Sequence, residues 1–329
     1  MIKLLITAAF ACLSVSHAPV YAQSIDSSRP ITVIVNVPPG GSSDALARLT
    51  GNALGATLNK SVIVENVTGA GGLIGVQKFL RAAPDGNTLL FINQSLVILP
   101  HLHKKSAYSA TKDVEPIGVV AKVPMVLSVS KQSGIKDLSA LTAKMKSSPN
   151  TLNFGSGGPG TTAHFAEALF LKQAGVRAQM IQYRGTGPAL SDLMAGNIDA
   201  VIDQTITMLP LHAGKRVTAI AVSGNERNSQ AKEIPTFAEG GMPQFDLAIW
   251  NGLVAPKGTP KDVLKKLQSS LAEATSTADF QTKLRELGAQ GLKSSEQGPA
   301  YFKQLINQDA DRVEILAKDG AFVSEDGRN

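Results

Sequence analysis

The chain has 329 residues, of which 43% are hydrophobic, and a formal net charge of +6, so it is long enough for two domains of ordinary size. Its basic residues are scattered and only 5% of its residues are aromatic, which argues against nucleic-acid binding because no basic stripe alternates with stacking side chains. The mild positive charge favours small acidic ligands or anionic surfaces.

The first 22 residues have the pattern of a secretory signal peptide. Lys3 gives a positive start, residues 4–15 form an apolar stretch too short to span a bilayer stably, and Val20-Tyr21-Ala22 offers a cleavage site. We expect cleavage after Ala22 and export of a soluble protein to the periplasm. The single cysteine, Cys12, lies inside this segment, so the mature chain would hold no disulfide.

The next part of the chain alternates strands with helices. Strands are predicted at 31–37, 62–64 and 88–92, a helix at 44–58, and a second helix after the glycine-rich turn at 69–72. The strands are apolar along their length, as in a sheet that is buried on both faces. This alternation predicts a mainly parallel sheet with helices on its faces.

A second α/β unit follows an apolar stretch at 117–129, which we expect to cross between two lobes. Its strands are predicted near 152–154, 179–183, 199–203 and 217–222, and its helices near 162–174 and 187–195. The chain is expected to cross back between 240 and 260, a region rich in Gly and Pro, and then to form amphipathic helices at 263–274 and 302–317.

Two crossings divide the mature chain into two lobes. The predicted first lobe contains residues 23–127 and 250–329, and the predicted second lobe contains residues 128–249. Two α/β lobes joined in this way form a hinged clamp, and ligands of open α/β sheets bind beyond the carboxyl ends of the strands.

A glycine-rich turn stands at such a strand end in each half of the sequence. The first is Pro38-Pro39-Gly40-Gly41-Ser42-Ser43-Asp44, and the second is Gly155-Ser156-Gly157-Gly158-Pro159-Gly160-Thr161-Thr162. Each leads into a helix, whose free backbone N–H groups and positive dipole end suit an anion. Two such turns that face each other would clamp a carboxylate or a phosphate.

Other interpretations of these residues are weaker. Gly155, Gly157 and Gly160 have the spacing of a dinucleotide fingerprint, and Arg184 after the next strand could meet a 2′-phosphate, but Pro159 is awkward in such a loop. A tight turn with no ligand is the plain alternative. No nucleophile elbow or Walker A sequence is present, so we expect no catalytic residue and no cofactor.

Metal binding is also not expected. His164 and Glu167 are three residues apart and could share a helix face, but a zinc site needs more ligands. Asp203, at the end of a strand, either accepts a hydrogen bond from an amino or hydroxyl group of the ligand or caps the next turn. Asp44 should point away from a bound anion, because an inward carboxylate would repel it.

With these turns in place, the chain resembles the Bug family, the periplasmic substrate-binding proteins of tripartite tricarboxylate transporters. The likeness covers nearly the whole mature sequence. It is carried by Pro39-Gly40-Gly41-Ser42-Ser43-Asp44, Gly69-Ala70-Gly71-Gly72, Ala83-Pro84-Asp85-Gly86-Asn87, Asn153-Phe154-Gly155-Ser156-Gly157-Gly158-Pro159-Gly160-Thr161, Tyr183-Arg184-Gly185, Gly196-Asn197-Ile198-Asp199 and Trp250-Asn251-Gly252. Each motif is weak alone, whereas their shared order is specific.

The resemblance implies a two-lobed Venus-flytrap fold, similar to type II periplasmic binding proteins, with a carboxylate held between the lobes by backbone amides. After the third strand the family commonly has a histidine, but this chain has Asn93-Gln94-Ser95, which could supply amide donors instead. The predicted ligand-binding residues are Pro39, Gly40, Gly41, Ser42, Asn93, Gln94, Ser156, Gly157, Thr161, Thr162 and Asp203.

Three functional hypotheses follow. The favoured one is a monomeric solute receptor that binds a small organic carboxylate, such as a dicarboxylate or an aromatic acid, and delivers it to the membrane components of a tripartite tricarboxylate-type transporter. A second keeps the fold but makes the protein a ligand sensor for a signalling receptor. A third, an exported α/β enzyme, needs an activated nucleophile or a metal centre that the sequence does not offer.

Overall fold

The computed structural model describes residues 25–26, 28–103 and 108–318; the predicted signal peptide lies outside them. Within these residues, nine strands are joined by hydrogen bonds in the order β2-β1-β3-β9-β4-β7-β5-β6, with β8 paired to β4. The strands are β1 (Ile31–Val35), β2 (Val62–Asn66), β3 (Thr88–Asn93), β4 (Val114–Val129), β5 (Asn153–Ser156), β6 (Gln179–Gln182), β7 (Ala200–Gln204), β8 (Thr218–Val222) and β9 (Ala248–Pro256).

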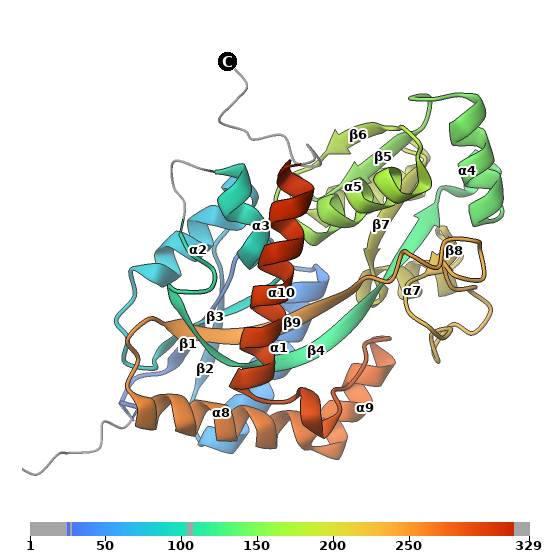
Figure 1. Cartoon of the computed structure of the whole chain (residues 1–329). Helices are drawn as coiled ribbons and strands as arrows, with labels where there is room; N and C mark the ends of the chain where they lie inside the picture. Colours follow the sequence, from blue (N-terminus) through green and yellow to red (C-terminus); the bar gives the residue numbers. More distant parts are fainter. Residues whose placement is uncertain (1–24, 27, 104–107, 319–329) are drawn as a thin grey trace, which may run out of the picture.

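Strand β4 belongs to two sheets. Its first part, up to Pro124, pairs with β9, whereas its last part, from Met125 to Val129, pairs with β7 and β8. Figure 1 shows β4 and β9 running together between the two halves of the molecule. We call the half built on β2, β1, β3, β9 and the start of β4 the first lobe, and the half built on the end of β4 with β5–β8 the second lobe. The expected α/β architecture with two lobes and two crossings is therefore present.

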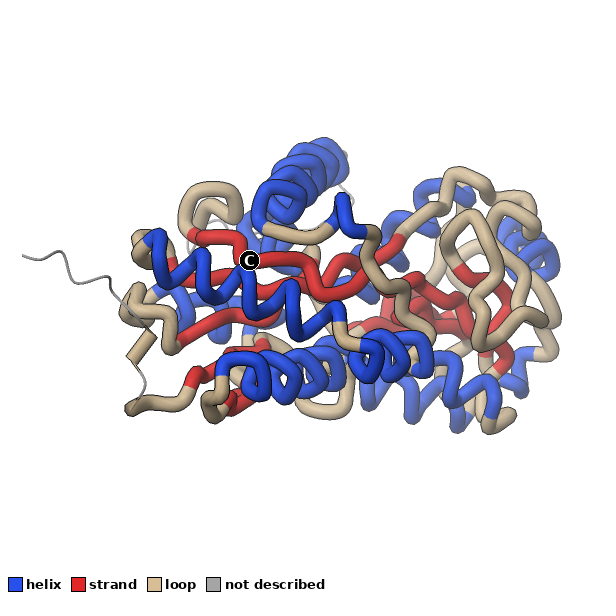
Figure 2. The backbone as a smooth tube through the Cα atoms, turned by 90° about the horizontal axis from the view of Figure 1, so that it is seen from below, coloured by secondary structure: helices blue, strands red, loops and turns tan. Residues whose placement is uncertain are grey.

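Helices cover both faces of the first-lobe sheet, as Figure 2 shows. The first-lobe helices are α1 (Ser42–Leu58), α2 (Leu73–Leu80), α3 (Ser95–Leu102), α8 (Lys261–Ser276), α9 (Ala278–Glu286) and α10 (Pro299–Lys318). Side chains of a strand alternate between faces: Val33 and Val35 pack with α1 and α8, whereas Ile34 packs with α2, α3 and α10. This explains why apolar residues occupy both faces of β1.

The second lobe has the same layered construction. Helices α4 (Leu138–Ser147) and α5 (Thr162–Ala174) pack on one face of its sheet, and α6 (Thr186–Ala195) and α7 (Thr205–Ala213) pack on the other. Its core contains a cluster of phenylalanines in which Phe170 lies 5.9 Å from Phe154 and 6.2 Å from both Phe237 and Phe245, measured between ring centroids. Aromatic pairs at such separations add to the stability gained from burial.

Most elements lie where the sequence places them. Helix α5 has the predicted bounds of 162–174, and the strands differ from their predicted ranges by a few residues at most. The helices α3, α4, α7 and α9 are additions to the prediction. The return crossing is β9, a regular strand within the Gly- and Pro-rich segment for which only a crossing was predicted.

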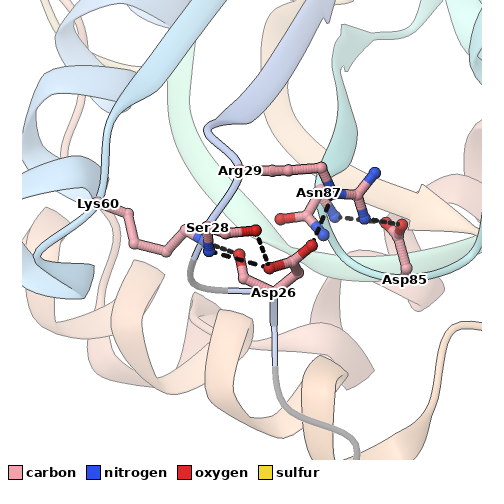
Figure 3. A network of polar contacts seen from close by, with 6 residues as sticks. All are labelled: Asp26, Ser28, Arg29, Lys60, Asp85 and Asn87. Carbon is pink, nitrogen blue, oxygen red and sulfur yellow. Dashed lines mark hydrogen bonds and ion pairs between the residues drawn. The ribbon is translucent and has the colours of Figure 1, made fainter.

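A polar network fixes the start of the described chain to the first lobe (Figure 3). The Ser28 hydroxyl donates to Asp26 Oδ1 at 2.7 Å, and Arg29 Nη2 donates to Asp85 Oδ2 at 2.7 Å. Lys60, just after α1, donates to the backbone carbonyl of Asp26. Three separate segments thus meet at the end of the lobe where β1 begins. None of the described helices has both the length and the apolar character needed to cross a membrane.

Candidate ligand-binding site

A cavity of about 600 Å³ lies between the two lobes. Its lining comes from the segments that follow the parallel strands. These are 36–39, 41 and 43 after β1; 68–72 after β2; 93 and 95 after β3; 157–159, 161 and 162 after β5; 183–187 after β6; and 203–204 at the end of β7. Both glycine-rich turns therefore open onto one shared crevice, at the strand ends where α/β proteins bind ligands.

Five helices follow residues that line this cavity. The residues that precede α1, α2, α6 and α7 are Gly41, Gly72, Gly185 and Gln204; all four line the cavity, and none of them caps its helix through a side chain. Only α5 is capped in this way, by Thr161 Oγ1, which accepts a hydrogen bond from the His164 N–H at 3.3 Å. Because the first N–H groups of a helix lack intrahelical partners and carry partial positive charge, the cavity suits an anion.

The first-lobe wall is polar and uncharged. Asn93 Nδ2 donates to Ser43 Oγ at 3.0 Å, the Ser95 N–H donates to Asn93 Oδ1 at 2.9 Å, and Asn36 Nδ2 donates to Ser95 Oγ at 3.3 Å. All four side chains are buried. Their mutual hydrogen bonds hold the side-chain amides of Asn36 and Asn93 in fixed positions at the cavity.

Asp44 points away from the cavity, as expected. Its carboxylate accepts hydrogen bonds from the Gly40 N–H at 3.0 Å and from Asn66 Nδ2 at 2.9 Å, and it pairs with Arg48. The carboxylate thereby stabilises the turn before α1 and leaves the interior of the cavity free of its charge.

Asp203 is the acidic residue of the lining. Its side chain is buried, and its Oδ2 accepts a hydrogen bond from Thr207 Oγ1 at 2.7 Å. Burial raises the pKa of this carboxyl to about 6, and hydrogen bonds from Thr207 and from the Gln204 N–H oppose the rise. The sequence left two roles open for Asp203, accepting a hydrogen bond from the ligand or capping the next turn. The two are compatible, because Asp203 lines the cavity and also accepts a hydrogen bond from Thr207 in the first turn of α7.

Of the predicted binding residues, Pro39, Gly41, Asn93, Gly157, Thr161, Thr162 and Asp203 line the cavity. Gly40, Ser42, Gln94 and Ser156 lie outside the lining. Gln94 Nε2 donates to the Ala248 carbonyl at 3.3 Å, at the start of β9, and Ser156 Oγ donates to Gln182 Oε1 at 2.7 Å. The structure shows which of these residues line the cavity, whereas their contact with a ligand stays a prediction.

The sequence-based list omitted two loops of the lining. The turn at 68–72 and the loop at 183–187 both follow parallel strands, so the strand-end rule that selected the two long turns could have selected them as well. The second of these loops contributes Arg184, the basic residue of the lining.

His164 and Glu167 lie in α5, behind the cavity wall. Burial lowers the pKa of His164 to about 4 and raises that of Glu167 to about 8, so both side chains are mainly neutral at pH 7. Within the described parts of the chain, no group of three or more His, Cys, Asp or Glu side chains could hold a metal ion.

Comparisons with known proteins agree with this geometry. Residues 46–321 match the model of the tripartite tricarboxylate transporter family receptor. The chain is 35% identical to the protein BugT of Bordetella pertussis over 259 residues, which cover 78% of this chain and 79% of BugT.

Two solved structures are similar over their whole length. The periplasmic binding protein BugD is 32% identical, with a TM-score of 0.84 over 89% of this chain and 98% of BugD. MatC of Rhodopseudomonas palustris, solved with bound malate, is 31% identical, with a TM-score of 0.82 over 88% of this chain and 99% of MatC. A two-lobed α/β fold, a cavity ringed by helix starts and a family match over most of the sequence lead to one assignment: this chain belongs to the tripartite tricarboxylate transporter receptor family, the Bug family of periplasmic solute-binding proteins.

Proposed function

We propose that this protein is a periplasmic receptor that binds a small organic carboxylate between its two lobes and delivers it to a tripartite tricarboxylate-type membrane transporter. The observation that carries the proposal is the cavity between the lobes, where α1, α6 and α7 begin without side-chain caps. The similar protein MatC was solved with malate, a carboxylate small enough for a cavity of about 600 Å³.

Backbone donors can account for useful affinity. A hydrogen bond to a charged group contributes about 1.5–3 kcal/mol, and micromolar binding corresponds to about −8 kcal/mol. Several N–H groups at the starts of α1, α6 and α7 would therefore reach this affinity after the cost of ordering the ligand. Lobe closure around the ligand would select one conformation for recognition by the transporter.

The preferred ligand carries two carboxylates. The helix starts hold the first, and Arg184, which is exposed at the cavity, pairs with the second. In this proposal the ligand leaves unchanged. The hydroxyls of Ser43 and Ser95 accept hydrogen bonds from asparagine amides, which are too weakly basic to activate either serine as a nucleophile.

The chain acts as an exported monomer. Residues 1–22 are removed after Ala22, residues 23–127 and 250–329 form the first lobe, and residues 128–249 form the second. Mass spectrometry of the protein from a periplasmic extract tests the cleavage site, with Gln23 expected as the first residue. Loss of malate uptake in cells that lack this receptor alone tests delivery to a transporter; unchanged uptake of every bound carboxylate counts against it.

Calorimetry of the purified mature protein tests the binding function. We expect malate, succinate or adipate to bind with micromolar Kd, and absence of binding by every carboxylate tried would overturn the proposal. Arg184→Gln should weaken dicarboxylate binding about tenfold, which corresponds to ~1.4 kcal/mol, and leave monocarboxylates of equal length unaffected. Arg177→Gln is the matched control, because Arg177 is an exposed arginine of the same lobe outside the cavity.

A further inference from the structure

The two lobes touch at positions where the chain has glycine. Gly71, in the first-lobe turn between β2 and α2, lies against Pro159 of the second lobe: a Cβ added to Gly71 would stand 2.1 Å from the Pro159 carbonyl oxygen. Gly185, in the second-lobe loop between β6 and α6, lies against Pro38 of the first lobe, with an added Cβ 2.9 Å from Pro38 Cγ. Each distance is below the 3.0 Å at which Cβ contacts cease to occur in proteins.

Both contacts belong to the cavity wall. Gly71, Pro159, Gly185 and Pro38 all line the space between the lobes. Each pair joins one lobe to the other across the crevice, so the pairs are the places where the lobes meet when the cavity is enclosed. Other glycines of the lining have no such contact across the crevice: a Cβ at Gly187 would meet nothing within 4 Å, and one at Gly72 would meet Asn36 of its own lobe. Close approach between the lobes is therefore a property of particular glycines.

We propose that Gly71 and Gly185 form a closure seam, in which the lack of a side chain allows the lobes to come together. A methyl group at Gly71 would require the first-lobe turn and the Pro159 carbonyl to separate by almost an ångström. Since this carbonyl is part of the backbone, the separation cannot be relieved by a change of rotamer. The variant protein would therefore populate the closed arrangement less.

The backbone conformation of the seam glycines is a separate effect that needs its own control. Gly71 has φ +63° and Gly185 has φ +99°, so alanine at either position is also strained within its own loop. Gly175 at φ +62° and Gly241 at φ +89° also have positive φ, but a Cβ at these positions would meet nothing within 4 Å. Gly175→Ala and Gly241→Ala thus place alanine at a positive φ without any contact between lobes.

The distance between the lobes tests the seam directly. Spin labels on Ser61→Cys and Lys146→Cys, which are exposed positions on the first and second lobes, report this distance by pulsed electron resonance. The only native cysteine is Cys12, which the mature chain would lack. With saturating malate, Gly71→Ala and Gly185→Ala should shift the distribution to longer distances, whereas Gly175→Ala and Gly241→Ala should match the parent.

A second substitution separates the seam contact from loop distortion. Pro38→Ala removes the Cγ and Cδ atoms that lie 2.9 and 3.5 Å from the added Cβ and leaves Cβ at 3.6 Å, an ordinary contact. The double variant Gly185→Ala/Pro38→Ala should therefore recover the short distance, while Pro38→Ala alone should keep it. A long distance in the double variant would overturn the steric explanation.

The effect on affinity rests on the proposed function, whereas the distance measurement does not. If the fraction of closed molecules falls to a tenth of that in the parent protein, the Kd for malate rises about tenfold, because only closed molecules hold the ligand. If no carboxylate binds the parent, the proposed function fails and the distances measured without ligand still test the seam. Identical distances in Gly71→Ala, Gly175→Ala and the parent would refute the inference in either case.

Discussion

The buried carboxyl of Glu167, in the second lobe, makes the stability of the folded chain depend on pH. Its side chain is 1% exposed in α5, and burial raises its pKa from 4.5 to about 8. Between these values the folded chain keeps a proton that the unfolded chain has lost. The free energy of unfolding therefore falls as pH rises from 4.5 to 8.

The size of this effect follows from the shift in pKa. Each unit is worth ~1.36 kcal/mol, so the full interval from 4.5 to about 8 corresponds to about 4–5 kcal/mol. Glu167→Gln has no proton to lose. We expect the variant and the parent to have similar stability near pH 4.5, and the variant to be more stable by several kcal/mol at pH 8.

Urea denaturation at pH 5 and pH 8 measures this difference. The fluorescence of Trp250, the only tryptophan and a buried side chain, reports unfolding. Glu273→Gln, on the exposed face of α8, is the matched control and should change stability equally at both pH values. Equal loss of stability between pH 5 and pH 8 in the parent and in Glu167→Gln would refute the reasoning.

Three further changes test other parts of the structure. Because burial raises the pKa of Asp203 to about 6 and its ionised form repels an anion, malate affinity should fall as pH rises from 5 to 8, and Asp203→Asn should flatten that dependence in calorimetry. Thr161→Val removes the hydroxyl that accepts from the His164 N–H at 3.3 Å and should lower the free energy of unfolding by about 1 kcal/mol; no change in urea denaturation would show that the cap does not contribute. Phe170→Ala opens the aromatic cluster of the second lobe and should cost about 3–5 kcal/mol, with a cost below ~1 kcal/mol inconsistent with the packing described.

Local sequence signals were sufficient for some helices. Helix α5 is an example, because Thr161 caps its first turn and Gly175, at φ +62°, ends it. Helices α4 and α9 were missed despite their side-chain caps, Asp137 and Thr277. Helix α3 has no such signal: it is buried on nearly all sides, has no side-chain cap and contains Pro100. A helix that is apolar all round lacks a 3.6-residue period, so only its packing against β3 and α10 identifies it.

Strand β9 was not predicted as a strand, because glycine normally weakens a strand. In the structure, Gly252 lies beneath the Phe302 ring of α10, and an added Cβ would stand 2.6 Å from Phe302 Cζ. The glycine permits a close approach between layers, which local sequence cannot reveal. The same limit applies to the site: the strand-end turns were predictable, whereas the contacts of Gly71 with Pro159 and of Gly185 with Pro38 depend on how the lobes meet.

The position of β9 also sets an order of folding. This strand lies between β3 and β4, although the chain reaches it only after all the strands of the second lobe. In a chain that emerges from its N-terminus, the second lobe can pair its last strand, β8, while β3 and the start of β4 still have open edges. Unpaired edges invite aggregation, so the nascent first lobe needs protection until residues 248–256 arrive to complete its sheet.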